Sequence, residues 1–240
     1  MMRTIAFEHL ILSPGHAVWN LRGDPLADNS WYLRDYQRGE ACFYLEHIRH
    51  AVELGAADPT ALLIFSGSQT FAAAGPRSEA QGYWMLAEHF DWWGHAAVCP
   101  RSTTEEFALD SFQNVLFSLC RFHEFTGVWP VRVTVAGWAF KARRFVDLHR
   151  AAVRFPLERF HYAGVNGPAD LATARRAEAS NRRAFAADPY GCLKSLAAKR
   201  LERDPFRRRH GYAVSCPELR ALLEHRGPEQ FAGPLPWDTL

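Results

Sequence analysis

The stretch Ala-Leu-Leu-Ile-Phe-Ser-Gly-Ser-Gln-Thr, residues 61–70, decides the fold. Its first five residues form a continuous apolar run, which is the pattern of a strand buried on both faces of a parallel sheet. The run passes directly into Ser66-Gly67-Ser68, and small polar residues of this kind are typical of the turn from a strand into a helix. The stretch therefore predicts a buried strand whose C-terminal end opens into a loop suited to a ligand.

Similar apolar runs lie on both sides of this stretch. We predict further strands at residues 5–12, 131–136 and 160–165, and a weaker one around residues 96–99. Apolar residues at helical spacing predict helices between them, at residues 40–54, 78–90, 110–125 and 140–155. Strands that alternate with helices indicate right-handed βαβ units. The expected fold class is α/β, a three-layer α/β/α Rossmann-like sandwich with a mostly parallel sheet.

The last third of the chain has a different character. Alanine-rich and arginine-rich patterns predict helices at residues 169–187, 191–203 and 217–226, and the end of the chain is rich in proline. We therefore expect a Rossmann-like domain over residues 1–166 and a helical C-terminal extension over residues 167–240 that packs on it.

Composition limits the classes of function. With 240 residues, of which 48% are hydrophobic, the chain can bury the core of one domain. The net charge of +2 and the absence of a long apolar segment argue against nucleic acid and membrane partners. The five cysteines are odd in number, widely spaced and without a C-x-x-C pair, which favours reduced thiols and a cytoplasmic location. The oligomeric state is left open.

Polar residues gather at the predicted strand ends. Gly15 and His16 follow the first strand, and Ser66, Gly67, Ser68 and Thr70 follow the second. Ligands of open α/β sheets bind beyond the carboxyl ends of the strands, where free backbone N–H groups attract anions. We predict that these loops bind a small anionic ligand, although ordinary strand-to-helix turns use the same residue types.

Acidic residues lie near the same loops. Glu79 is close to the start of one predicted helix, and Glu105 precedes Asp110, Ser111 and Asn114 at the start of another. Carboxylates beside an anion site suit general acid–base catalysis or a divalent cation. Helix capping is the alternative for Asp110 and Ser111. The spacing to Asn114 favours Glu105 over Glu106 as the residue that faces the site.

Three basic residues, Lys141, Arg143 and Arg144, open the helix after the third strand. Cations at a helix N-terminus oppose the helix dipole, so we expect an anionic partner there, either a ligand or a salt-bridging carboxylate. The glycine-rich phosphate-binding and dinucleotide-binding motifs, the nucleophile elbow and the H-E-x-x-H zinc motif are absent.

The ordered set of these loop motifs resembles the SanA/YdcF/ElyC family, a domain of unknown function with a Rossmann-like sandwich. The resemblance covers about two thirds of the chain, from His9 to Gly164. Three positions depart from the family pattern: Ser68 replaces the second glycine of Ser-Gly-Gly, Asp110-Ser111 replaces Asn-Thr, and Lys141 replaces the histidine of His-x-x-Arg. The motifs that carry the resemblance are residues 15–19, 65–70, 78–80, 105–114 and 141–144.

The resemblance implies an enzymatic or small-ligand-binding domain. Bacterial members of the family are linked to cell-envelope integrity and usually carry a membrane anchor, which we do not expect in this chain. If the family histidine is an essential base, Lys141 changes that chemistry here.

The sequence thus predicts a hydrolase or transferase that acts on a phosphorylated or nucleotide-like small molecule. Expected catalytic residues are Glu79, Glu105 and Lys141, and expected ligand-binding residues are Gly15, His16, Ser66, Gly67, Ser68, Thr70, Asp110, Ser111, Asn114 and Arg144. A divalent metal such as Mg²⁺ and a nucleotide-type ligand are the candidate cofactors. The alternatives are a non-catalytic module that binds a nucleotide or S-adenosylmethionine, and an interaction protein that uses the helical extension.

Overall fold

The computed structural model describes residues 6–165, 167–168 and 170–239 and confirms the α/β sandwich. Its main sheet has five strands, all parallel, in the order β5-β4-β1-β6-β7. Their bounds are β1 His9–Pro14, β4 Ala61–Ser66, β5 Ser102–Glu105, β6 Arg132–Trp138 and β7 Phe160–Val165. From β1 the chain builds β4 and β5 on one side and then crosses to build β6 and β7 on the other. The reversal between β1 and β6 marks the place where ligands bind in such folds.

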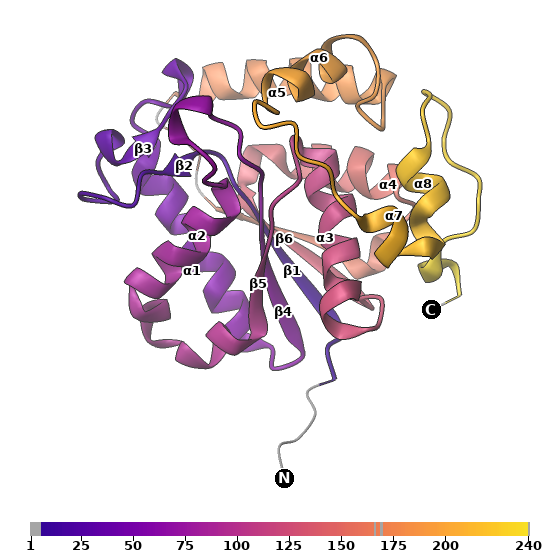
Figure 1. Ribbon diagram of the computed structural model, residues 1–240, viewed down its shortest axis with the longest axis horizontal. Helices are drawn as coiled ribbons and strands as arrows, with labels where there is room; N and C mark the ends of the chain where they lie inside the picture. Colours follow the sequence, from indigo (N-terminus) through magenta and orange to yellow (C-terminus); the bar gives the residue numbers. More distant parts are fainter. Residues whose placement is uncertain (1–5, 166, 169, 240) are drawn as a thin grey trace.

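Helices cover both faces of this sheet (Figure 1). Those that surround it are α1 Ala41–Ala57, α2 Glu79–His89, α3 Ser111–Thr126, a π-helical segment Arg144–His149 and α4 Arg150–Ala152. The side chains of β1 alternate between the faces: Leu10 and Leu12 join a core with α3, and Ile11 joins a core with α1 and α2.

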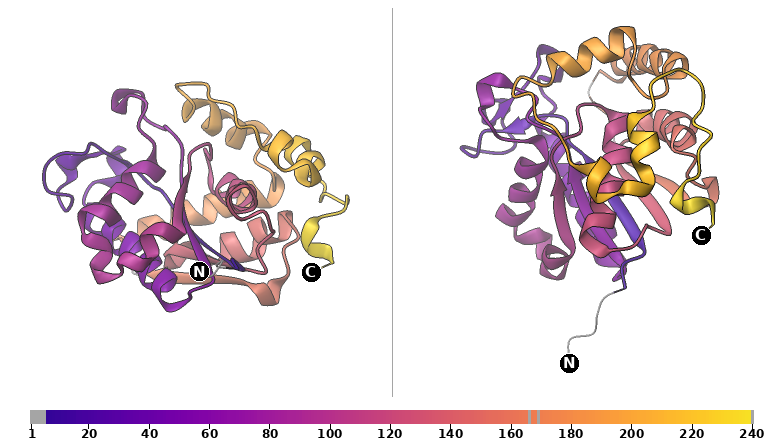
Figure 2. Two further views of the ribbon diagram at one scale, coloured as in Figure 1. Left: turned by 60° about the horizontal axis from the view of Figure 1, so that its bottom comes forward. Right: turned by 45° about the vertical axis from the view of Figure 1, so that its right-hand side comes forward.

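The C-terminal third of the chain packs on the sheet. Its helices are α5 Leu171–Ala187, α6 Lys194–Glu202, α7 Tyr212–Ser215 and α8 Arg220–Glu224. Figures 1 and 2 show α5 and α6 across the top of the sheet, above the strand ends, and α7 and α8 beside α3. Phe185, Leu196 and Leu222 of the extension belong to the same buried cluster as Leu10 and Leu12 of β1.

Shorter elements complete the chain. A small antiparallel pair, β2 Val18–Trp19 and β3 Trp31–Tyr32, was not predicted. Short 3-10 turns lie at Asp28–Ser30, Asp35–Gln37, Ala72–Ala74, Asp91–Gly94, Ala96–Arg101, Ala139–Lys141, Leu157–Arg159, Pro217–Leu219 and Pro236–Asp238. No helix in the described ranges is long and apolar enough to cross a membrane.

Several predicted boundaries were wrong. The first strand begins at His9 rather than Ile5, which lies outside the described residues, as does Ala169 at the start of a predicted helix. The predicted strand at residues 96–99 is a 3-10 turn, and the strand follows it as the polar β5. The helix predicted at residues 140–155 is helical without a gap, passing from a 3-10 turn through the π-helical segment into α4, but it ends at Ala152 rather than Phe155.

Candidate functional site

A cavity of about 900 Å³ lies at the strand ends, around the reversal between β1 and β6. Residues that follow β1, β4, β5 and β6 form its floor and walls, and α5 and α6 contribute side chains from above. Of the predicted site residues, nine line this cavity: Gly15, His16, Thr70, Glu79, Asp110, Ser111, Asn114, Lys141 and Arg144.

Glu79 is the acidic residue at the floor of the cavity. It is the first residue of α2, after the N-cap Ser78, and its side chain is buried with the residue 8% exposed. The Thr70 hydroxyl donates to Glu79 Oε1 at 2.5 Å. Burial raises the pKa of Glu79, while Thr70 and the cations Arg203, Arg34 and Lys141 oppose the rise. A buried carboxyl group whose pKa is raised has the chemistry of a general acid or base.

Two glycines allow Glu79 to sit where it does. A Cβ added to Gly15 would lie 2.5 Å from Glu79 Cβ, and one added to Gly67 would lie 2.7 Å from Glu79 Oε2. The two strand-end loops therefore close around this one carboxyl group. At Gly15 and Gly67, the group that lies against the backbone is the Glu79 side chain.

The backbone N–H groups of these loops are engaged within the protein. Gly15 donates to the Ser66 carbonyl at 2.7 Å, Gly67 to the Glu105 carbonyl at 3.0 Å and Ser68 to the Ala108 carbonyl at 3.0 Å. The predicted anion cradle of free amides at these three residues is therefore wrong. The amides join neighbouring loops at the sheet edge, so an anion would have to be held by side chains.

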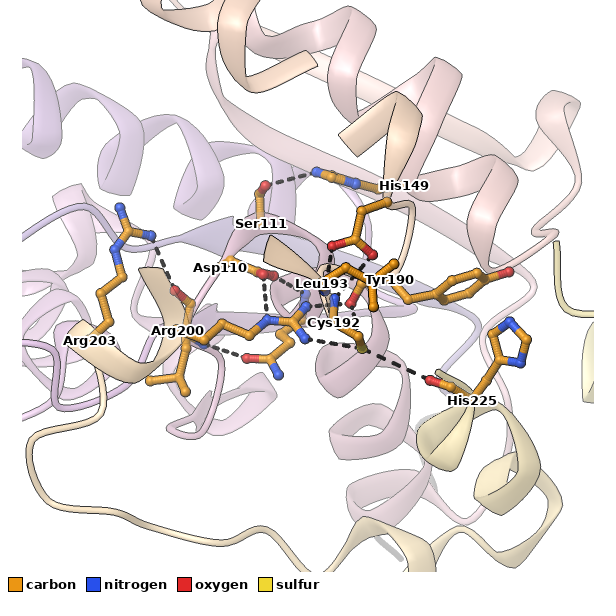
Figure 3. Close-up of polar contacts among 12 residues, drawn as sticks. Asp110, Ser111, His149, Tyr190, Cys192, Leu193, Arg200, Arg203 and His225 are labelled. Atoms are coloured by element: carbon orange, nitrogen blue, oxygen red, sulfur yellow. Dashed lines mark hydrogen bonds and ion pairs between the residues drawn. The ribbon is translucent and has the colours of Figure 1, made fainter. Parts of the chain in front are cut away.

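The cavity contains three cations that have no carboxylate partner among the described residues: Lys141, Lys199 and Arg203. Lys199 instead donates to Asn181 Oδ1 at 3.0 Å. Arg203, which is labelled in Figure 3, donates to the Leu109 carbonyl at 3.1 Å. Burial, followed by repulsion from Arg144, lowers the pKa of Lys141 to about 7. Burial and Arg203 likewise lower the pKa of Lys199. Cations that repel one another in this way favour an anion between them.

Most carboxylates of the cavity are already engaged. Glu178 pairs with Arg144 at 3.0 Å, Glu202 with Arg34 at 2.6 Å and Asp110 with Arg200 at 2.6 Å. Glu40 accepts a hydrogen bond from the Tyr44 hydroxyl at 2.7 Å, and burial raises its pKa. These ion pairs leave Lys141, Lys199 and Arg203 as the cavity cations without a carboxylate partner in the described part of the chain.

Asp110 and Ser111 begin α3 at the wall of the cavity. The Asp110 carboxylate accepts from the Gln113 backbone N–H at 2.9 Å, so the predicted capping role is confirmed, and it also pairs with Arg200 of α6. The Ser111 hydroxyl lies 2.8 Å from His149 Nε2 (Figure 3). It also lies 3.1 Å from Arg144 Nη1.

Glu105 does not reach the cavity. It is 1% exposed, and its carboxylate accepts from the backbone N–H groups of Phe107 and Ala108 and from the hydroxyls of Ser66 and Tyr212. Burial raises the pKa of Glu105 to about 7. The prediction that Glu105 faces the ligand is wrong, because the loop that follows it folds back onto its own carboxylate. Ser66, Gly67 and Ser68 also lie outside the cavity lining.

His16 stands between the cavity and an aromatic cluster. Its ring packs near Tyr44, His47 and Trp138, with centroid distances of 5.6, 5.4 and 6.0 Å. Burial and the nearby Lys141 hold the pKa of His16 well below its ordinary value, so the ring is neutral at pH 7. His16 therefore lines the cavity as a neutral polar residue and does not add to the positive charge of Lys141, Lys199 and Arg203.

Within the described part of the chain no three or more His, Cys, Asp or Glu side chains are arranged to hold a metal ion. Glu79 and Glu105, for which acid–base chemistry or a divalent metal site was left open, do not share the cavity, because only Glu79 lines it.

Comparison with known proteins places the chain in a family. The chain is 30% identical, over a 280-position alignment, to the uncharacterized protein YOR238W of Saccharomyces cerevisiae, and the alignment covers 90% of each chain. The chain belongs to the family of this yeast protein. No protein-family model matches the chain, and no solved structure matches it significantly.

The site in this family member includes side chains that the sequence did not single out. Glu178 comes from α5, Lys199 from α6 and Arg203 from the position directly after α6. Arg34 and Glu40 come from the segment that precedes α1. Lys199 and Arg203 are four residues apart, a spacing that places them on one face of a helix. That spacing was available in the sequence, but it could not tell whether this face would point to solvent or to the sheet.

Proposed function

We propose that the chain is an enzyme that acts on a phosphorylated or nucleotide-like small molecule, by phosphoester hydrolysis or group transfer. The observation that carries the proposal is a set of three cations, Lys141, Lys199 and Arg203, in the same cavity as Glu79. Within the described ranges none of the three has a carboxylate partner. The cations would hold the anionic group, and Glu79 would move a proton. The resemblance to the SanA/YdcF/ElyC family remains a proposal that rests on the same strand-end loops.

The volume and the lining of the cavity also suit a ligand that is larger than a phosphate group. The cavity volume is within the range of small-molecule sites, and Trp138, Phe140 and Tyr162 give the cavity apolar surface. A ligand that combines an anionic group with a ring system fits this lining. The free cysteines agree with a cytoplasmic location, which is part of the proposal.

The test is a thermal-shift panel of nucleotides, sugar phosphates, simple phosphoesters and S-adenosylmethionine, each with and without Mg²⁺. A ligand at about 100 times its Kd adds about 2.7 kcal/mol to the free energy of unfolding, which raises the Tm by roughly 5 to 10 °C for a chain of this size. Compounds that stabilise the protein are then incubated with it and analysed for turnover.

Glu79→Gln separates catalysis from binding. It should retain ligand binding, because the cations remain, and lose turnover by about 100-fold or more. Glu88→Gln is the matched control, since Glu88 is an exposed residue of the same helix α2. A ligand that binds but is recovered unchanged would replace the enzyme proposal with a binding module. The absence of any shift would reject the anionic ligand.

A further inference from the structure

The hydroxyl of Ser111, which lines the cavity, has two side-chain hydrogen-bond partners. Ser111 is the first residue of α3, and two side chains from the π-helical segment contact its oxygen: His149 Nε2 at 2.8 Å and Arg144 Nη1 at 3.1 Å. A serine within hydrogen-bond distance of a histidine has the geometry of a nucleophile and its base. The directions of the hydrogen bonds decide whether it has that role.

Arg144 is always a donor. Its guanidinium has no acceptor atom and keeps its proton in proteins, so Nη1 donates to Ser111 Oγ and uses one of the two lone pairs of the oxygen. Arg144 is only 8% exposed, and its guanidinium also forms the ion pair with Glu178. The Arg144 contact therefore cannot reverse.

The tautomer of His149 follows from its surroundings. The ring is fully buried against Phe112, Phe145 and Phe185, and burial together with Arg144 and Arg200 keeps its pKa far below 6.5, so it is neutral. Its Nδ1 has no hydrogen-bond partner in the described part of the chain. A hydrogen on Nδ1 would be a buried donor without an acceptor, which is rarer than an unpaired buried acceptor. The hydrogen therefore belongs on Nε2.

The π-helical segment explains why both side chains reach one oxygen. Arg144 and His149 are five residues apart, and in an α-helix they would point about 140° away from each other. A π-helix bonds residue i to residue i+5, which brings side chains five apart toward the same face. Such segments often occur at functional sites.

We propose that Ser111 is a preset hydrogen-bond donor that binds an anionic oxygen of the ligand, and that it is not a nucleophile. Nε2–H of His149 and Nη1–H of Arg144 occupy both lone pairs of Ser111 Oγ, so its own hydrogen is directed to an acceptor in the cavity. His149 and Arg144 are positioning residues that act through Ser111. The identity of the acceptor as a phosphoryl oxygen rests on the proposed function, whereas the hydrogen-bond directions do not.

The first experiment determines the tautomer of His149 in the full chain without ligand. Nitrogen-15 histidine labelling and two-bond ¹H–¹⁵N correlation spectra show which ring nitrogen carries the hydrogen, and His149→Gln assigns the signal. We expect the Nε2–H pattern for His149 across pH 6 to 8. An Nδ1–H pattern, or an imidazolium pattern at pH 7, would overturn the proposal.

The second experiment tests reactivity with a fluorophosphonate, which labels activated serine hydroxyls. We expect no covalent adduct on Ser111 by intact-mass and peptide analysis. An adduct that is present in wild type and in Ser180→Ala, and is lost in Ser111→Ala, would establish a nucleophile and overturn the proposal. Ser180 is the matched control because it lines the same cavity from α5.

The third experiment measures sulfate binding by calorimetry, since sulfate does not titrate between pH 6 and 8. Loss of a hydrogen bond to a charged oxygen should weaken binding by about 10- to 100-fold in Ser111→Ala, with recovery in Ser111→Thr and no change in Ser180→Ala. Equal binding by wild type and Ser111→Ala would reject the donor role. If wild type binds neither sulfate nor any phosphorylated compound, the proposed function fails, while the tautomer result still decides the hydrogen-bond directions.

Discussion

At the scale of single residues, Gly15 is a position where the structure leaves no room for a side chain. A Cβ there would approach both Glu79 Cβ and, at 2.9 Å, Glu79 Oε2. Gly15→Ala should therefore displace Glu79 and lower the free energy of unfolding by about 1–3 kcal/mol, as overpacking of buried sites does. Urea denaturation measures this change. Gly211→Ala is the control, because a Cβ at Gly211 has no neighbour within 4 Å; equal stability of the two variants would contradict the argument.

Lys141 makes the charge of the cavity depend on pH. Since its pKa is lowered to about 7, the ammonium group is present below pH 7 and lost above it. The affinity for sulfate should therefore fall as the pH rises from 6 to 8. Lys141→Arg keeps its charge throughout this range and should remove most of that fall. Calorimetric titrations at several pH values check this, and an identical pH profile in the two proteins would refute it.

The same residues show what sequence reasoning can reach. Glu79, Lys141 and Arg144 were predicted because strand-end loops and helix starts have recognisable local patterns, and they do line the cavity. Glu105 carries the same local pattern but turns inward. Its carboxylate is bound by Tyr212, which is more than a hundred residues away in the chain, and no local pattern contains that contact.

At the scale of elements, β4, β5 and α3 are joined by a chain of three polar side chains. Ser66 Oγ lies 2.7 Å from Glu105 Oε2 and 2.9 Å from Asn114 Oδ1, but its single hydrogen can be donated to only one of them. The protonation state of Glu105 therefore decides which group Asn114 presents to the cavity. Glu105 and Ser66 can influence the site without touching a ligand.

The direction of this effect follows from the pKa of Glu105, which is about 7. Below it, Glu105 donates to Ser66, Ser66 donates to Asn114 Oδ1, and the Asn114 amide NH₂ is free for the cavity. Above it, the Glu105 carboxylate takes the Ser66 hydrogen, and Asn114 must rotate to donate to Ser66. The side-chain ¹⁵N and ¹H signals of Asn114 should therefore shift with a midpoint near pH 7.

Ser66→Ala should abolish that shift, even though Lys141 still titrates in the same range. The side chain of Asn181, which lines the cavity from α5, serves as the internal reference for the Lys141 effect. An Asn114 shift of equal size in Ser66→Ala would show that Lys141, and not Glu105, causes it.

Elements were predictable where their burial pattern was simple. The buried strand β4 and the capped helices α2 and α3 follow from apolar runs and from Ser78 and Asp110 as N-caps. The edge strand β5 has the sequence Ser-Thr-Thr-Glu and is half-buried. Because these residues are polar, the strand was predicted at the apolar turn that precedes it. The π-helical segment was missed because an apolar periodicity of 3.6 does not reveal one inserted residue.

At the scale of the whole molecule, the extension and the sheet domain form one buried cluster. Tyr190, Leu196, Tyr212 and Leu222 of the extension belong to the cluster that includes strand residues of β1, β4 and β6. The extension was predicted to pack on the sheet. Its contribution of Lys199 and Arg203 to the cavity was not, because the amphipathic pattern of α6 does not specify which surface its apolar residue Leu196 will cover.

This shared core predicts that the chain unfolds as one cooperative unit. Leu222 of α8 is 2% exposed, so Leu222→Ala should leave a cavity and lower the free energy of unfolding by about 2–5 kcal/mol. Leu201→Ala is the control, since Leu201 of α6 is 78% exposed and its loss should change stability by less than about 0.5 kcal/mol. Far-ultraviolet circular dichroism and tryptophan fluorescence should report one coincident transition for wild type and, at lower denaturant, for Leu222→Ala. The contrary outcome is that Leu222→Ala produces an early transition of the extension alone, while the sheet unfolds at the wild-type midpoint. In that case the stabilities of the two parts are independent of each other. The helix that carries Lys199 could then detach from the cavity without unfolding of the sheet.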